Sequence, residues 1–181
     1  MVSAVTSFIL PGLGNSSPDH WQSYFERIDV ACVRLLQEEW DSPDCDDWVK
    51  TLDQALRHAV GPVRLVAHSS SCAMVAHWAL TAAPETLAKV CGALLVAPSD
   101  PDAPRYPVGP TGFSPVPLLP LPFPSIVVAS TNDEYVNLDV ARDFARAWGS
   151  QLVVLEGAGH INAAAGFGPW PDGYALLCSL T

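Results

Sequence analysis

Apolar runs of strand length alternate along this chain with segments that have the periodicity of a helix. The six apolar runs cover residues 5–10, 31–36, 63–67, 90–97, 125–129 and 152–155. The helical segments cover residues 17–28, 42–60, 73–79, 138–148 and 174–180. Runs that are apolar almost throughout are typical of strands covered by helices on both faces of a parallel sheet. We therefore expect an α/β fold: a three-layer α/β/α sandwich with a mainly parallel sheet of about six strands, built as one domain over residues 1–181.

The longest break in this alternation lies between Pro98 and Pro124, where ten of the seventeen prolines fall. Proline donates no backbone hydrogen bond, so this segment is expected to form neither a helix nor a central strand. We expect a long extended loop on the surface. Long loops in compact domains are often functional, so part of this loop is a candidate border of a substrate site. A ligand for a proline-recognition domain is the alternative.

The charge balance excludes several classes of partner. Nineteen acidic residues against nine basic ones give a formal net charge of −10. Binding to nucleic acid or to an anionic membrane surface needs clustered Lys and Arg, so neither is expected as a partner. No apolar run reaches the roughly 18–20 residues that span a bilayer. The sequence is compatible with a homodimer.

The cysteines bear on the compartment and on metal binding. They are Cys32, Cys45, Cys72, Cys91 and Cys178. Their number is odd, and they form no CxxC pair and no metal-ligand spacing. Residues 1–6 read as the beginning of a strand rather than as a signal peptide. We therefore expect reduced thiols in a cytoplasmic protein, with no bound metal.

The segment Ala67-His68-Ser69-Ser70-Ser71 follows an apolar run directly and leads into a helix of small residues. A nucleophile elbow needs such a tight strand-to-helix turn, with tiny residues two positions before and after the nucleophile. The turn would lift the Ser69 hydroxyl above the sheet, and the N–H of Ser70 at the helix start would receive an oxyanion. Taken alone, the motif is also explained by a serine-rich helix cap.

Two further residues complete the set that an activated serine needs. A serine hydroxyl requires a base, and the base requires an orienting carboxylate. Asp133 and His160 each come shortly after an apolar strand-length run, in the chain order serine, acid, histidine that one large group of hydrolases uses. Because parallel strands place their sites beyond their carboxyl ends, we expect a Ser69–Asp133–His160 triad. Glu134 is the alternative acid.

Other histidines and serines fit these roles less well. His68 precedes the nucleophile, and its side chain is expected to point away from it. His58 lies on a helix without an evident partner, and His77, one helical turn beyond Ala73, is expected to be packed or to face solvent. Ser70 and Ser71 would stand later in the helix, outside the elbow.

The loop over residues 11–21 reads PGLGNSSPDHW. It lacks the third glycine and the acidic residue of a dinucleotide-binding fingerprint, so no cofactor is expected. In a hydrolase such a loop supplies the second oxyanion N–H, here expected from Leu13. We expect His20, Trp21 and Trp170 near the rim of the pocket.

Five segments are distinctive when taken together. They read PGLGNSSPDHWQ, VRLVAHSSSCAMVAHWA, GALLVAP, LPFPSIVVASTNDEYV and AWGSQLVVLEGAGHIN. Jointly they resemble one small serine-hydrolase family of the α/β-hydrolase superfamily, that of the human retinoblastoma-binding serine hydrolase and its bacterial relatives. The resemblance runs from about Val5 to Trp170. It implies a lid-less single-domain α/β-hydrolase whose nucleophile, acid and base fall on Ser69, Asp133 and His160.

The chain departs from that family pattern at two positions. Family members commonly carry glycine two residues after the nucleophile, where this chain has Ser71. Their acid loop commonly reads Asp-Pro, where this chain has Asp133-Glu134. Neither departure removes a member of the triad.

The sequence therefore predicts a serine hydrolase that cleaves a small ester through an acyl-enzyme on Ser69, with thioesters and amides as alternatives. The Pro-rich loop together with Phe113, Phe123 and Trp170 suggests small hydrophobic acyl or alcohol groups in the substrate. A hydrolase-fold protein that acts mainly by binding another protein is the second hypothesis. It is suggested by the extended proline loop and the missing lid.

Overall fold

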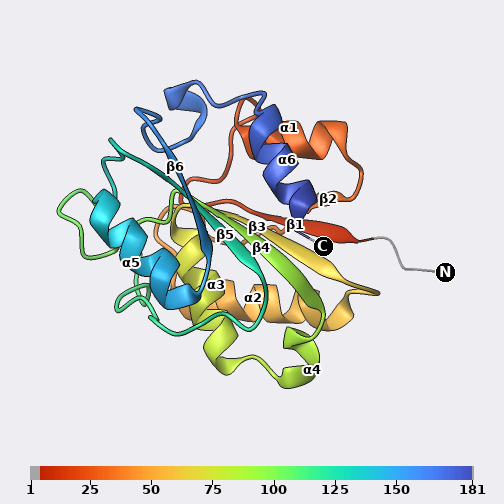
Figure 1. The fold of residues 1–181 in the computed structure, drawn as a ribbon. Helices are drawn as coiled ribbons and strands as arrows, with labels where there is room; N and C mark the ends of the chain where they lie inside the picture. The colour runs from red at the N-terminus through yellow and green to blue at the C-terminus, as the bar shows by residue number, and fades with distance from the viewer. Residues whose placement is uncertain (1–4, 181) are drawn as a thin grey trace.

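A single parallel sheet of six strands, in the order β2-β1-β3-β4-β5-β6, forms the centre of the computed structural model (Figure 1), which describes residues 5–180. The strands are β1 (Thr6–Leu10), β2 (Cys32–Arg34), β3 (Val63–His68), β4 (Val90–Val96), β5 (Ser125–Ser130) and β6 (Gln151–Leu155). The helices are α1 (Trp21–Ile28), α2 (Cys45–His58), α3 (Ser70–Thr81), α4 (Pro84–Leu87), α5 (Leu138–Trp148) and α6 (Pro171–Ser179), with a 3₁₀ turn η1 (Ala163–Ala165). The α/β prediction is confirmed, and every described strand pair is parallel. Residues 1–4 and 181 of the predicted domain lie outside the described residues.

Helices cover both faces of this sheet (Figure 1): α1 and α6 lie on one side, and α2, α3 and α5 on the other. Successive side chains of a strand point to opposite faces. In β3, Leu65 and Ala67 accordingly belong to the core under α2, α3 and α5, whereas Val66 belongs to the core under α1 and α6. Both kinds of position are fully buried. This two-sided burial is the reason the central strands are apolar without alternation.

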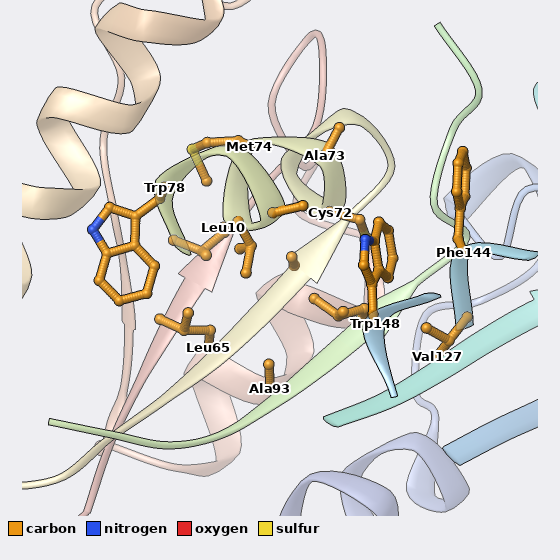
Figure 2. Close-up of a cluster of buried hydrophobic side chains, with 14 of the residues drawn as sticks. Leu10, Leu65, Cys72, Ala73, Met74, Trp78, Ala93, Val127, Phe144 and Trp148 are labelled. Carbon is orange, nitrogen blue, oxygen red and sulfur yellow. The ribbon is translucent and has the colours of Figure 1, made fainter. Parts of the chain in front are cut away.

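Helix α3 lies against the middle of the sheet, where Figure 2 shows Cys72, Ala73 and Met74 in the same cluster as Leu65 and Ala93. Small side chains on α3 allow the helix to approach the strands closely. Burial of the whole first half of the helix holds it rigidly, since protein cores are close-packed. Ser69, the residue immediately before α3, is therefore held by a rigid helix.

Several elements differ in detail from the sequence prediction. Helices α1 and α2 begin at Trp21 and Cys45, later than the expected residues 17 and 42, and α6 begins at Pro171, earlier than the expected residue 174. The second strand was expected over residues 31–36 but covers only Cys32–Arg34, because this edge strand pairs with β1 alone over three residues. The short helix α4, which begins with proline at its first position, was not predicted. Within residues 5–180, no helix is long and apolar enough to cross a membrane.

The Pro-rich segment between β4 and β5 contains no helix and no strand, as predicted. It is nevertheless held at several points. Phe113 is 2% exposed and enters the core, and the His77 ring hydrogen-bonds the Phe113 carbonyl at 3.1 Å. The indole N–H of Trp148 donates to the carbonyl of Pro117 at 2.8 Å. The loop is therefore a fixed part of the molecule that can contribute to a site.

Candidate active site

Ser69 joins the end of β3 directly to the start of α3. Its backbone has φ 59° and ψ −128°, a region that L-residues rarely adopt and that costs about 1–3 kcal/mol. Its N–H donates to the carbonyl of Val96 at 3.0 Å, which holds the turn against β4. Strand, turn and helix are thus fixed, and the strained turn is typical of a nucleophile elbow.

The loop after β1 packs directly against this turn. A Cβ atom on Gly12 would lie 2.7 Å from Ser69 Cβ and 3.0 Å from the His68 carbonyl oxygen, so only glycine fits. The Ser71 hydroxyl donates to the carbonyl of Pro11 at 2.6 Å and is buried. Ser71 therefore ties the loop after β1 to the first turn of α3 without leaving a buried polar group unpaired.

Hydrogen bonds join the three residues that the sequence singled out for the triad. His160 Nε2 lies 2.9 Å from Ser69 Oγ, and His160 Nδ1 lies 2.8 Å from Asp133 Oδ2. Because the carboxylate only accepts, Nδ1 carries the proton and Nε2 presents its lone pair to the serine hydroxyl. The Asp133 side chain is 0% exposed and also accepts from the Tyr135 N–H at 2.9 Å. This is the arrangement needed to activate a serine.

Glu134, the alternative acid, points elsewhere. It is exposed and forms an ion pair with Arg105 of the Pro-rich loop at 2.9 Å. Within residues 5–180, the His160 ring hydrogen-bonds Asp133 and not Glu134.

The loops that carry the acid and the base are joined to each other. Three successive N–H groups of residues 157–159 donate to the side chains of residues 130–132. The pairs are Gly157 to Thr131 at 2.9 Å, Ala158 to Ser130 at 3.0 Å and Gly159 to Asn132 at 2.7 Å. The segment STN before Asp133 thus fixes the position of His160 relative to the acid.

Two side chains hold the base loop from the other side. His68 Nε2 donates to the His160 carbonyl at 3.0 Å, and the Trp21 indole N–H donates to the Ile161 carbonyl at 2.9 Å. The sequence had assigned His68 no role, and nothing in its pattern revealed this long-range contact.

The expectation that Trp21 and Trp170 lie at the pocket rim is wrong. Trp21 is 0% exposed and Trp170 is 8% exposed, and their rings pack edge to face with centroids 5.3 Å apart. Neither lines the pocket. A buried indole needs an acceptor for its N–H, and Trp21 finds it in the base loop, beneath the site rather than around it.

The pocket above Ser69 has a volume of about 310 Å³ and is lined by both hydroxyl and amide side chains. Its lining residues are Leu13, Asn15, Ser17, His20, His68, Ser69, Ser70, Ser99, Tyr106, Pro107, Tyr135, His160, Asn162, Ala163 and Ala164. None of them is Asp, Glu, Lys or Arg. Tyr106 and Pro107 show that the Pro-rich loop borders this pocket, and the Tyr106 hydroxyl lies 2.9 Å from Ser70 Oγ.

The inference from Phe113 and Phe123 to a hydrophobic substrate is also wrong. Both rings are buried in the core, at 2% and 6% exposure, and neither lines the pocket. Aromatic residues of the loop serve to anchor it, and its polar Tyr106 is the one that faces the site.

Two buried histidines stand beside His160. The rings of His20 and His68 lie 4.7 Å apart, and those of His68 and His160 lie 4.9 Å apart. Burial, with Arg34 and His160 nearby, lowers the pKa of His20 to about 4. Burial likewise holds the pKa of His68 well below its usual value. Both rings are therefore neutral near pH 7 and place no positive charge next to the base.

The expected oxyanion donors come from two segments of the chain that meet at Ser69. Leu13, from the loop after β1, lines the pocket. Ser70 is the first residue of α3, and the first N–H groups of a helix have no acceptor within it. Sequence reasoning missed Ser99, which follows β4 and has its Oγ 2.8 Å from Ser69 Oγ. The sequence did contain one indication of this position: Ser99 comes shortly after an apolar strand-length run, as Asp133 does, and the carboxyl ends of parallel strands meet at the same edge of the sheet.

Nothing in the described part of the chain resembles a metal centre: no group of three or more His, Cys, Asp or Glu side chains there could hold an ion. The five cysteines are unpaired.

The comparisons with known proteins bear on the family and the fold. A family model described as serine hydrolase matches residues 7–179. A YdeN-like hydrolase from Pectobacterium atrosepticum is 34% identical, with a TM-score of 0.84 over 97% of this chain and 90% of its own. The ydeN gene product of Bacillus subtilis is 21% identical, with a TM-score of 0.78 over 98% of both chains. A thermophilic esterase from Thermogutta terrifontis shares the fold at 15% identity and a TM-score of 0.70, covering 99% of this chain and 90% of its own. A search of curated proteins found no match.

Proposed function

Since this chain belongs to the serine hydrolase family, whose model matches residues 7–179, we propose that it hydrolyses a small uncharged ester through an acyl-enzyme on Ser69. The observation that carries the proposal is the continuous hydrogen-bonded set from Ser69 Oγ through His160 to Asp133, which lies at the base of a pocket. Thioesters and amides are the alternative substrates, since they undergo the same acyl transfer.

Acylation begins when Ser69 Oγ attacks the carbonyl carbon of the ester. The hydroxyl proton passes to His160 Nε2, which lies 2.9 Å away. Asp133, held by the Tyr135 N–H, keeps the imidazole in the required tautomer and stabilises the imidazolium. His160 then donates this proton to the leaving alcohol oxygen, and the carbon–oxygen bond of the ester breaks.

The negative charge on the carbonyl oxygen needs donors that are in place before the reaction. We assign this role to the backbone N–H groups of Leu13 and Ser70, the second of which also lies at the positive end of α3. One such donor contributes about 3–4 kcal/mol to transition-state stabilisation. Deacylation repeats the sequence with water, which gives a proton to His160 and attacks the acyl carbon.

The pocket limits the substrate in two ways. A volume of about 310 Å³ is at the lower end of the usual range for small-molecule sites, so it holds a short acyl chain together with a small alcohol. The lining carries no formally charged Asp, Glu, Lys or Arg side chain, and an unpaired charged group would lose its hydration there without a partner. We therefore propose neutral esters with short, partly polar acyl groups.

Labelling with a fluorophosphonate probe tests the nucleophile. We expect the wild type to be labelled on Ser69, Ser69→Ala to be unlabelled, and His160→Ala to be labelled more slowly by at least about 100-fold, as expected when a serine loses its base. Glu134→Gln is the matched control for Asp133→Asn: the first should leave turnover unchanged and the second should lower it.

A panel of p-nitrophenyl esters then tests the substrate class. Acetate and methoxyacetate esters should be hydrolysed with a higher kcat/KM than the octanoate ester. A folded wild type that neither reacts with the probe nor turns over any ester would contradict the proposal and favour a protein-binding role for the fold.

A further inference from the structure

Ser69 Oγ has a second neighbour besides His160. Ser99 Oγ lies 2.8 Å from it, and Ser99 is only 3% exposed. Both serines line the pocket, and Ser69 Oγ lies within hydrogen-bond distance of both Ser99 Oγ and His160 Nε2. Ser99 stands three residues after the end of β4, in the first part of the Pro-rich loop.

The direction of the hydrogen bond between the two serines follows from the other contacts. Asp133 accepts from His160 Nδ1, so Nε2 of the neutral imidazole can only accept. The single Ser69 proton must therefore point to Nε2 for the nucleophile to be activated. The proton in the Ser99–Ser69 hydrogen bond then comes from Ser99. The chain of donors runs from Ser99 to Ser69 to His160 to Asp133.

We propose that Ser99 is a fourth member of the catalytic set, a donor to the oxygen atom that attacks; this inference rests on the proposed function of Ser69. Before attack, Ser99 occupies a lone pair of Ser69 Oγ and so directs the Ser69 proton toward His160. As that proton leaves, negative charge develops on Oγ before the bond to the acyl carbon is complete. The Ser99 O–H stabilises this charge and keeps its own proton throughout.

The same donor acts in deacylation. When water has attacked the acyl-enzyme, the bond between the acyl carbon and Ser69 Oγ breaks and its electron pair returns to Oγ. The proton on His160 passes to that oxygen, and the Ser99 hydroxyl hydrogen-bonds it during the transfer. No electron or proton is exchanged with Ser99, so the step balances without a further reactant.

The position of Ser99 separates it from the proposed oxyanion hole. Strand β3, which leads to Ser69, lies between β1 and β4 in the sheet. Leu13 follows β1 and Ser99 follows β4, so the two approach Ser69 from opposite sides. Ser99 therefore acts on the nucleophile oxygen rather than on the carbonyl oxygen of the substrate.

Three variants test this inference. Ser99→Ala removes the hydroxyl, whereas Ser99→Thr and Ser99→Val add the same volume and differ only in the hydroxyl. We expect the Ala and Val variants to lose about tenfold in kcat and in the rate of fluorophosphonate labelling, the effect of one hydrogen bond of ordinary strength. KM should change less than twofold. Ser99→Thr should keep at least about a third of the wild-type rate.

The thermal midpoints of the Thr and Val variants serve as the packing control. We expect the Val variant to lie no more than about 4 °C below the Thr variant, since the two side chains fill the same volume and the lost hydrogen bond is worth about 1 kcal/mol. Equal rates for Thr and Val, or an Ala variant as fast as the wild type, would overturn the role of Ser99 while leaving the Ser69 nucleophile intact. An unlabelled wild type would instead contradict the proposed function itself, and with it the inference.

Discussion

The strained backbone of Ser69 is a local property that a single substitution can relieve. At φ 59° and ψ −128°, glycine is free of the steric conflict that any other residue meets. We expect Ser69→Gly to exceed Ser69→Ala in free energy of unfolding by about 1 kcal/mol, once the greater entropy of glycine in the unfolded chain is subtracted. Both variants lack the hydroxyl, so urea unfolding of the pair isolates the strain. An Ala variant at least as stable as the Gly variant would contradict the presence of backbone strain at Ser69.

Gly12 is required for a different reason: a side chain at this position would collide with Ser69. Its φ is not positive, so alanine suits the backbone, but the new Cβ would lie 2.7 Å from Ser69 Cβ. We expect Gly12→Ala to displace Ser69 and to lower kcat on the order of 100-fold, as a misplacement of about 1 Å does. Steady-state kinetics with p-nitrophenyl acetate measures this.

Gly149→Ala is the control for that substitution. Gly149 has φ 70° and open space around it, and it ends α5 away from the pocket. Its replacement should cost stability and leave kcat unchanged. A Gly12→Ala variant with wild-type kcat would show that the loop after β1 can move without consequence.

At the scale of elements, two tryptophans make the same contact on opposite faces of the sheet. Trp21 of α1 donates its indole N–H to the base loop at Ile161, and Trp148 of α5 donates to the Pro-rich loop at Pro117. Both are almost completely buried. Replacement by phenylalanine removes the donor and leaves a carbonyl unpaired, which costs about 1–3 kcal/mol in each case.

Only one of these two substitutions should lower kcat. We expect Trp21→Phe to lower kcat, because the loop it anchors carries His160, and Trp148→Phe to leave kcat unchanged at a similar loss of thermal midpoint. Equal effects on kcat would mean that activity follows overall stability rather than the position of the base loop. Kinetics and thermal unfolding of the two variants, measured side by side, decide between these outcomes.

At the scale of the whole molecule, the buried neutral histidines make stability depend on pH. Burial lowers the pKa of His20 from its usual 6.5, which applies to the unfolded chain, to about 4 in the folded state. Below pH 6.5 the unfolded chain therefore binds more protons. Stability due to this group is therefore full above pH 6.5 and is lost as the pH falls toward 4. The loss amounts to about 3 kcal/mol between pH 8 and pH 4. His68 acts in the same direction.

His20→Asn tests this contribution with little change in local structure. His20 caps α1 by accepting from the Gln22 N–H, and asparagine is a good cap that does not ionise in this range. We expect the free energy of unfolding of the variant to fall less steeply than that of the wild type between pH 8 and pH 4, as measured by urea unfolding. Parallel curves would contradict the role of His20, because the carboxylates contribute equally to both proteins.

The residue types and their order along the chain were sufficient to predict much of this molecule. The continuous apolar runs predicted the parallel sheet, because strands buried on both faces admit few polar residues. Ser69, Asp133 and His160 could be singled out because each follows such a run, and the carboxyl ends of parallel strands meet at one edge. The family resemblance, now supported by the match over residues 7–179, rests on the same segments.

Contacts between distant segments were decided only by the tertiary structure. Ser99 next to Ser69, His68 on the His160 carbonyl and Trp21 on the Ile161 carbonyl join residues 30, 92 and 140 positions apart. No periodicity or motif encodes such pairs. These contacts depend on the order of the strands in the sheet, which decides which loops are neighbours. They also depend on which buried side chains in those loops need a hydrogen-bond partner. The same reason placed Trp21, Trp170, Phe113 and Phe123 in the core rather than around the pocket: an aromatic side chain lies where apolar area is buried, and the sequence alone does not say which face that is.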